Sequence, residues 1–204
     1  MQVLSCQRAV SLIASRKLMP ADACASPGPA RAQRGFTLVE LMVTMTIALV
    51  LIMIAVPSFK NIILQNKLTT AANDVVGAIN LARMEAIKRN ASTQLCGSAS
   101  NGTDTLGKAC KQAGEVYALS NGVVTQVRAG ASGISAPIAL TGNMIPVRFG
   151  GQGLGHPVSS TAPYSGPIAD ISTSSISTRN HRCIRMTAGS ILATTTSSAA
   201  CPTS

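Results

Sequence analysis

The sequence has few aromatic side chains and no signature of an enzyme. Its 204 residues include no Trp, two Tyr and three Phe, and the only histidines are His156 and His181. Without large rings, a core must be built from small aliphatic side chains, which favours a light, β-rich domain. No GxSxG or HExxH motif occurs, and no Lys-Ser/Thr pair follows the glycine-rich residues 150–155 as it would in a phosphate loop. We therefore expect no catalysis, no cofactor and no metal.

Acidic residues are also scarce. Seven Asp and Glu stand against 17 Lys and Arg, so the formal net charge is +10. Five of the basic residues and one acidic residue precede Phe36, so the chain without that segment carries about +6. Such an excess suits a protein that binds a polyanion and equally one that is merely soluble. Charge alone therefore does not identify a partner.

One long apolar run, residues 36–56, contains a single charge, that of Glu40. As a helix with a rise of 1.5 Å per residue, it would span the roughly 30 Å hydrocarbon layer of a membrane. Arg31 and Arg34 precede the run, so the positive-inside tendency leaves its N-terminal end in the cytoplasm. A secretory signal peptide is the alternative, but the run is long for one and the charge lies within it.

Glu40 requires an explanation, because an ionised carboxylate inside a membrane helix costs on the order of a few kcal/mol. A cation at the same depth would offset that cost. Cleavage between Gly35 and Phe36 would create an α-amino group that could serve, on the same chain or on a neighbouring subunit. Glu40 would then set the axial register of adjacent helices.

The residues around Glu40 carry a resemblance to a known family. The segment RGFTLVELMVTMTIALVLIMIAVPSF resembles the class III signal of type IV pilins and type II secretion pseudopilins. The matching residues are Arg34, Gly35, Phe36, Thr37, Leu38, Glu40 and Pro57. The resemblance implies that prepilin peptidase cuts after Gly35 and methylates the Phe36 amine. Residues 1–35 would then be a long cleaved leader, with translation starting at Met1 or at Met19.

A helical pattern continues beyond the apolar run. Pro57 should kink the helix rather than end it, because apolar residues recur at spacings of three and four from Leu68 to Ile87. The helix should end near Asn90. Residues 79–96, INLARMEAIKRNASTQLC, are similar to the helix end and first strand of the GspH/FimT family of minor pilins and pseudopilins. That resemblance implies a type IV pilin-like α+β fold, in which a long N-terminal helix packs on a small antiparallel β-domain.

Charged residues near the end of this helix allow two interpretations. Glu85 and Arg89 have the i,i+4 spacing of an ion pair, and Arg83 lies one turn before Ile87. Both Arg83 and the Glu85–Arg89 pair belong to the residues that carry the resemblance to the GspH/FimT family. Alternatively, they are a solvated helix face.

Beyond Asn90, short strand-like segments alternate with clusters of Gly, Ser, Asn and Pro. The expected strands are residues 93–96, 115–119, 123–128, 138–140, 145–149, 183–186 and 190–194. Two long loops, residues 97–111 and 150–177, should join them. The expected division of the chain is a leader (1–35), a membrane or filament-core helix (36–56), its amphipathic continuation (57–90) and a β-rich domain (91–204).

Four cysteines follow the apolar run, and none belongs to a CxxC pair. Three pairings are open, and nearness in the sequence favours Cys96 with Cys110 and Cys183 with Cys201. Disulfides persist in oxidising compartments, which places this part of the chain in the periplasm or outside the cell. Reduced, partly buried thiols are one alternative. A metal site using His181 and Cys183 is another, against which Cys201 offers a disulfide partner.

DNA binding is a further hypothesis. Some members of the resembled family bind DNA through a Gly-Arg-x-Arg motif, but the comparable residues 189–192 read GSIL and lack both arginines. Arg179, Arg182 and Arg185 lie just upstream and could contact phosphates with salt-dependent affinity. With so few aromatic side chains for base stacking, any such binding should be independent of sequence.

These features predict a minor pilin-like structural subunit near the tip of a type II secretion pseudopilus or a type IV pilus. Expected partners are other pilins or pseudopilins, prepilin peptidase, an inner-membrane assembly platform and inner-membrane lipid. The expected location is the inner membrane, with one span and a periplasmic C-terminal domain, and then the filament. The alternatives are a DNA-binding minor pilin for DNA uptake and a membrane-anchored periplasmic binding protein that never polymerises.

Overall fold

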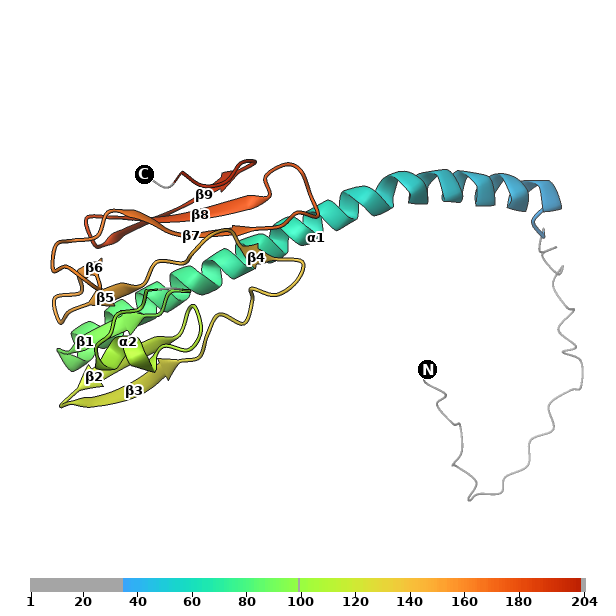
Figure 1. Ribbon diagram of the computed structural model, residues 1–204. Coiled ribbons are helices and arrows are strands. Elements are labelled where there is room, and N and C mark those ends of the chain that lie inside the picture. The colour runs from blue at the N-terminus through green and yellow to red at the C-terminus, as the bar shows by residue number, and fades with distance from the viewer. Residues whose placement is uncertain (1–34, 99, 203–204) are drawn as a thin grey trace, which may run out of the picture. The chain divides into compact units, whose positions relative to one another are not determined.

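The computed structural model describes residues 35–98 and 100–202 (Figure 1). The expected leader, apart from Gly35, lies outside this range. The described chain consists of one long helix, a short helix and nine strands. The expectation of an α+β fold, with a long N-terminal helix and an antiparallel β-domain, is confirmed.

Helix α1 covers Leu38–Arg89 and continues through Pro57. Thr37 caps its start, because the Thr37 hydroxyl oxygen accepts a hydrogen bond of 3.2 Å from the Glu40 backbone N–H. At its end, Asn90 adopts the left-handed conformation, with φ 46°. The Ala91 N–H donates to the Ala86 carbonyl and the Asn90 N–H to the Ile87 carbonyl, which is the Schellman arrangement. Asn tolerates this conformation, so the sequence itself stops the helix there.

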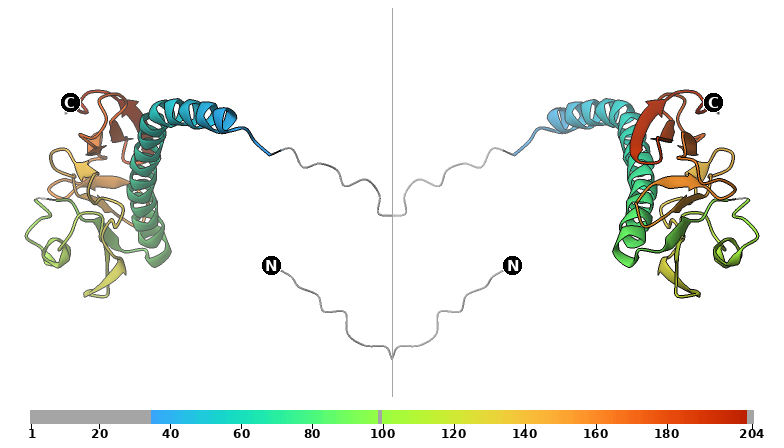
Figure 2. Two further views of the ribbon diagram at one scale, coloured as in Figure 1. Left: turned by 90° about the vertical axis from the view of Figure 1, so that its right-hand side faces the viewer. Right: turned by 90° about the vertical axis from the view of Figure 1, so that its left-hand side faces the viewer.

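The strands form two antiparallel sheets. The first has the order β3-β2-β1-β5-β6 and the second the order β4-β7-β8-β9. The strands of the first sheet are β1 (Ser92–Leu95), β2 (Val116–Ser120), β3 (Val123–Arg128), β5 (Val147–Phe149) and β6 (Gly155–Pro157). Those of the second are β4 (Ala139–Leu140), β7 (Gly166–Ser172), β8 (His181–Thr187) and β9 (Ile191–Ser197). Both sheets lie on the same side of the C-terminal half of α1 (Figure 2).

The apolar face of α1 is the centre of the core. Leu68, Val75, Ile79 and Ala86 are each at most 1% exposed and belong to one cluster with Phe149 and other strand residues. The period of three and four in the sequence therefore faces the sheets, as expected. Small residues such as Ala86 let the sheets approach the helix closely, in keeping with a core that has few aromatic rings.

The prediction of two long loops is wrong in part. Residues 97–111 contain helix α2 (Thr105–Ala109), and residues 150–177 contain strands β6 and β7. The Asp104 carboxylate caps α2 by accepting the Gly107 N–H at 3.2 Å. β6 and β7 hold the Gly and Pro residues that suggested loops, but β6 pairs with β5, and β7 pairs with β4 and β8. Their neighbours, rather than local propensity, make these segments strands.

Candidate functional site

The N-terminal part of α1 has an apolar surface against which no other described element packs. Phe36 is 81% exposed, and every residue from Gly35 to Phe59 is exposed. Among the described residues, α1 is the helix that is long and apolar enough to cross a membrane. Glu40 is also exposed, and its side chain has no hydrogen bond or ion pair within residues 35–98 and 100–202. A carboxylate in this setting needs a partner from outside the described chain or from another molecule.

Thr37 and Glu40 have the spacing of a capping box, a signal that the sequence reading missed. In such a box a Thr at the N-cap is followed three residues later by a Glu. One of the two hydrogen bonds of such a box is present, the one from the Glu40 N–H to the Thr37 hydroxyl oxygen. Thr37 therefore holds the backbone of Glu40 at a fixed place in the first turn, where a negative side chain also complements the helix dipole.

The C-terminal end of α1 is fastened to the β-domain by a charged and an apolar side chain. The Arg83 guanidinium donates a hydrogen bond of 3.1 Å to the Ser190 carbonyl, between β8 and β9. Gly153 lies against Arg83 and Ile87: a Cβ built on it would be 2.7 Å from the Ile87 Cδ1 atom. Gly153 also has φ +73°, so two constraints favour glycine there. Arg83 thus forms a defined contact, although half of Ile87, expected in the buried stripe, is exposed.

Glu85 and Arg89 form the expected ion pair. The Arg89 Nε atom lies 2.6 Å from a Glu85 oxygen, and Lys88 approaches the other oxygen at 3.6 Å. The hydrogen bond from Arg89 lowers the pKa of Glu85. Arg89 also donates to the Thr125 hydroxyl on β3 at 3.1 Å, so this pair joins the helix end to the sheet. The solvated-face interpretation holds for Lys88, whose side chain is 77% exposed.

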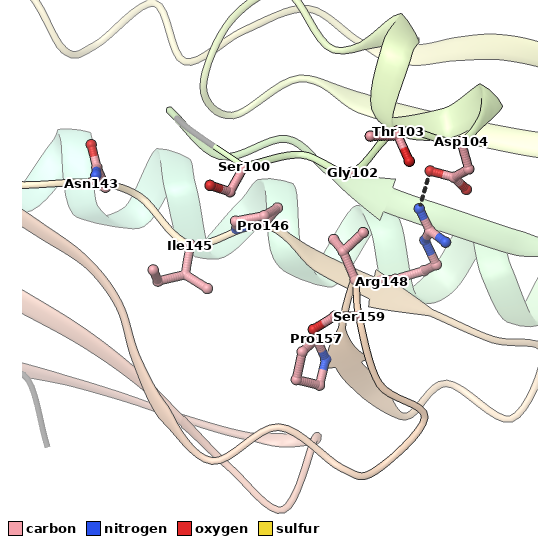
Figure 3. Close-up of a pocket in the computed structure, with 11 residues that line it drawn as sticks. Ser100, Gly102, Thr103, Asp104, Asn143, Ile145, Pro146, Arg148, Pro157 and Ser159 are labelled. Carbon is pink, nitrogen blue, oxygen red and sulfur yellow. Dashed lines mark hydrogen bonds and ion pairs between the residues drawn. The ribbon is translucent and has the colours of Figure 1, made fainter.

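A pocket of about 590 Å³ opens beside β5 and α2 (Figure 3). The Arg148 guanidinium, from β5, donates to the Asp104 carboxylate at 2.9 Å and to the Gln94 side-chain oxygen at 2.6 Å. Ile145 and Pro146 line another side. Burial raises the pKa of Asp104, but the hydrogen bonds from Arg148 and the Gly107 N–H outweigh it, and the pKa is lowered overall. With Arg148 already engaged by two acceptors, the pair chiefly fixes the α2 loop to the sheet.

Each of the two disulfides joins one cysteine to the next cysteine along the chain. Cys96 is bonded to Cys110, and Cys183 to Cys201. Asp170, His181 and Cys201 lie close enough together to suggest a metal site. However, the Cys201 sulfur is in a disulfide, and the Asp170 oxygens accept from the His181 Nδ1 atom at 2.9 Å and from the Cys201 N–H at 3.0 Å. This group therefore stabilises β7, β8 and the C-terminal segment and offers no thiolate to a metal.

The three arginines expected to form one basic cluster do not lie together on the surface. Arg179 is exposed and Arg185 is half-buried, but Arg182 is 5% exposed. Arg182 donates to the Gln65 carbonyl at 3.3 Å and to the Arg179 carbonyl at 2.8 Å. Burial, together with the charge of Arg179, lowers the pKa of Arg182. The expectation that Arg182 is available to a DNA phosphate is wrong, because its guanidinium is used to hold the β7–β8 loop against α1.

Two known protein families match parts of the chain. Residues 30–56 match the prokaryotic N-terminal methylation motif, which is the class III prepilin signal. Residues 71–190 match the type II transport protein GspH. The match covers more than half of the chain, so the chain belongs to this family of structural, pilin-like proteins. No curated protein and no solved structure matches it.

These matches give the chain a general role. It is a minor pilin of the type used in type II secretion or type IV pilus systems. The signal and the apolar helix next to it indicate an anchor with a single membrane span. Family membership implies processing by prepilin peptidase and assembly with other pilins.

Proposed function

We propose that the chain is a minor subunit, stored in the inner membrane, that is incorporated near the tip of a pseudopilus or pilus and supports secretion or pilus biogenesis. The observation that carries this proposal is the exposed apolar surface of α1 together with the Glu40 carboxylate, which has no partner among the residues that the structure describes. A helix apolar on all sides suits first lipid and then the packed centre of a helical filament. The β-domain would present its surface to partner proteins.

The proposed assembly step depends on the N-terminus. After cleavage at Gly35, the Phe36 amine and the Glu40 carboxylate of adjacent subunits would pair at one axial offset. Packing of the apolar helices would supply the assembly energy, whereas an assembly platform and its ATPase would be other chains. A periplasmic β-domain is supported by Arg31 and Arg34 before the span and by two disulfides, which persist in oxidising compartments.

Substitution of Glu40 tests the proposal. Glu40→Ala should leave the subunit processed and in the membrane but absent from sheared filaments, because the register contact is lost. Thr44→Ala is a matched control in the same exposed segment and should still be incorporated. Equal incorporation of the two variants would refute the register role of Glu40. Full function of Glu40→Ala without incorporation of the chain into filaments would favour an anchored binding protein that does not polymerise.

Deletion of the chain tells the two filament systems apart. A secretion subunit predicts exoproteins stranded in the periplasm, and a pilus subunit predicts loss of piliation, twitching or DNA uptake. Direct DNA binding has weaker support, because Arg182 is buried. A gel shift with duplex DNA at two salt concentrations checks it: a salt-sensitive shift would revive the DNA-uptake role.

A further inference from the structure

The end of the β-domain that adjoins the apolar run carries cations and no acidic side chain. We call this the basal surface: the exposed face of residues 58–67 of α1, the loop 132–137 and the loop 173–179. The two loops flank α1, because Gly133 and Ser135 share a pocket with Lys67, and Ser174 and Thr178 share one with Asn61 and Gln65. Its exposed cations are Lys60, Lys67 and Arg179.

No acid elsewhere in the described domain compensates these charges. Between Thr46 and Asp74 there is no Asp or Glu, and neither basal loop contains one. The acids beyond that point are used locally: Asp74 with Arg128, Glu85 with Lys88 and Arg89, Asp104 with Arg148, Glu115 with the Lys111 and Gln112 N–H groups, and Asp170 with His181. Arg182 lies just behind the surface, and its hydrogen bonds go to carbonyl and hydroxyl oxygens. The basal surface is therefore a region of uncompensated positive charge.

The positions along α1 place Lys60 at the level of lipid headgroups, and Lys67 and Arg179 beyond that level on the aqueous side. If Val56 marks the end of the hydrocarbon layer, Lys60 lies about 6 Å and Gln65 about 14 Å beyond it, at 1.5 Å per residue. The headgroup layer is roughly 5–8 Å thick. Arg182 holds Arg179 beside Gln65, so Arg179 lies within about one Debye length, 8–10 Å, of the headgroups. A tilted helix brings the groups on the side toward which it leans closer to the headgroups.

Hydrogen-bond donors accompany the charge. A pocket of about 350 Å³ between α1 and the β7–β8 loop is lined by Asn61, Gln65, Ser174, Ser175, Ile176, Ser177 and Thr178. Hydroxyl and amide groups can donate to phosphate oxygens, and Thr178 adjoins Arg179. Ile176 is 8% exposed and anchors the loop in the core, so these donors are held in place.

We propose that the basal surface binds anionic phospholipid headgroups of the membrane in which the subunit is stored. This inference rests on the proposed function only in requiring that α1 spans that membrane. Each cation near an anionic surface should favour the docked state about fivefold, so three should favour it about 100-fold. The docked domain would have to leave the lipid when the subunit enters a filament, and incorporation would therefore exchange headgroup contacts for subunit contacts.

The test uses the full-length chain, purified and reconstituted into vesicles. A fluorophore on Ser132→Cys, in a chain that also carries Cys6→Ser and Cys24→Ser, reports contact with lipids that carry a quencher on the headgroup. Ser132 lies in a basal loop but outside the hydroxyl-lined pocket. Quenching should be stronger in vesicles containing phosphatidylglycerol than in pure phosphatidylcholine, and molar salt should abolish the difference. The variant Lys60→Gln/Lys67→Gln/Arg179→Gln should lose the difference. The control Lys88→Gln/Lys108→Gln/Lys111→Gln removes the same charge away from the basal surface and should retain it.

Five results separate the explanations. Equal quenching of the unaltered chain in both vesicles would overturn the headgroup site, as would equal loss in the two triple variants. Release by inorganic phosphate at matched ionic strength would show a site for free phosphate instead, and release by duplex DNA would show a general polyanion surface. Loss of the chain from vesicles on alkaline washing would instead contradict the membrane-stored subunit itself. The effect of molar salt is measured on the unaltered chain. It therefore tests the proposal even if one of the triple variants fails to fold.

Discussion

Arg83 provides the most direct test of how the helix end is joined to the β-domain. Its guanidinium donates to the Ser190 carbonyl at 3.1 Å from a half-buried position. Arg83→Met keeps most of the aliphatic length and removes the donor. A hydrogen bond from a charged group contributes about 1.5–3 kcal/mol. We expect the free energy of unfolding of the domain to fall by that amount.

Hydrogen–deuterium exchange of the full-length chain in detergent micelles measures this loss. Amides of β8 and β9 that exchange through unfolding of the domain should exchange roughly 10- to 100-fold faster in Arg83→Met, since about 1.4 kcal/mol is a tenfold change. Arg83→Lys should lie between the two, because an ammonium keeps the charge but not the planar fork.

Lys88→Met is the matched control on the same helix. The Lys88 side chain is 77% exposed, and its ion pair with Glu85 is a surface contact, so exchange should change little. Equal exchange rates in Arg83→Met, Lys88→Met and the unaltered chain would refute the assignment of Arg83 as a structural contact. The solvated-face interpretation would then apply to Arg83 as it does to Lys88.

Three further predictions concern stability. Replacing Cys96 and Cys110 by Ser should lower the free energy of unfolding by about 3 kcal/mol, measured in urea, because the disulfide closes a loop with a sequence separation of 14. Phe149→Ala removes a fully buried ring and should cost about 3–5 kcal/mol in the same assay, whereas Val123→Ala, at a residue 61% exposed, should cost under about 0.5 kcal/mol. The pKa of Asp104 is lowered from 3.8, so its stabilising contact with Arg148 is complete above pH 3.8 and lost as the pH falls through the folded-state value. Hydrogen–deuterium exchange of the α2 amides should accelerate as the pH falls below the folded-state pKa of Asp104. The variant Asp104→Asn should not show this acceleration.

The helix and several strands could be predicted because their signals are local. α1 ends at Arg89 because Asn90 supports a left-handed turn, and β3 has the expected bounds of Val123 and Arg128 because an Asn-Gly turn precedes it. β7 could not be predicted in this way. It contains Gly, Pro and a buried acid, Asp170, whose carboxylate is hydrogen-bonded to His181 and to the Cys201 N–H, 11 and 31 residues further on. No local pattern reports such partners.

Arg182 shows why the candidate site could not be fully predicted from the sequence. In the sequence it stands among Arg179, His181 and Arg185 and looks like part of a basic patch. Strand alternation turns it inward, where it replaces water with carbonyl and hydroxyl acceptors from α1 and its own loop. The buried Arg182 guanidinium still contributes to the basal surface. Its charge has no carboxylate partner among the described residues, so it adds to the positive potential around Arg179. Part of the excess positive charge read from the composition therefore lies at the basal surface, where no acid of the described domain pairs with it.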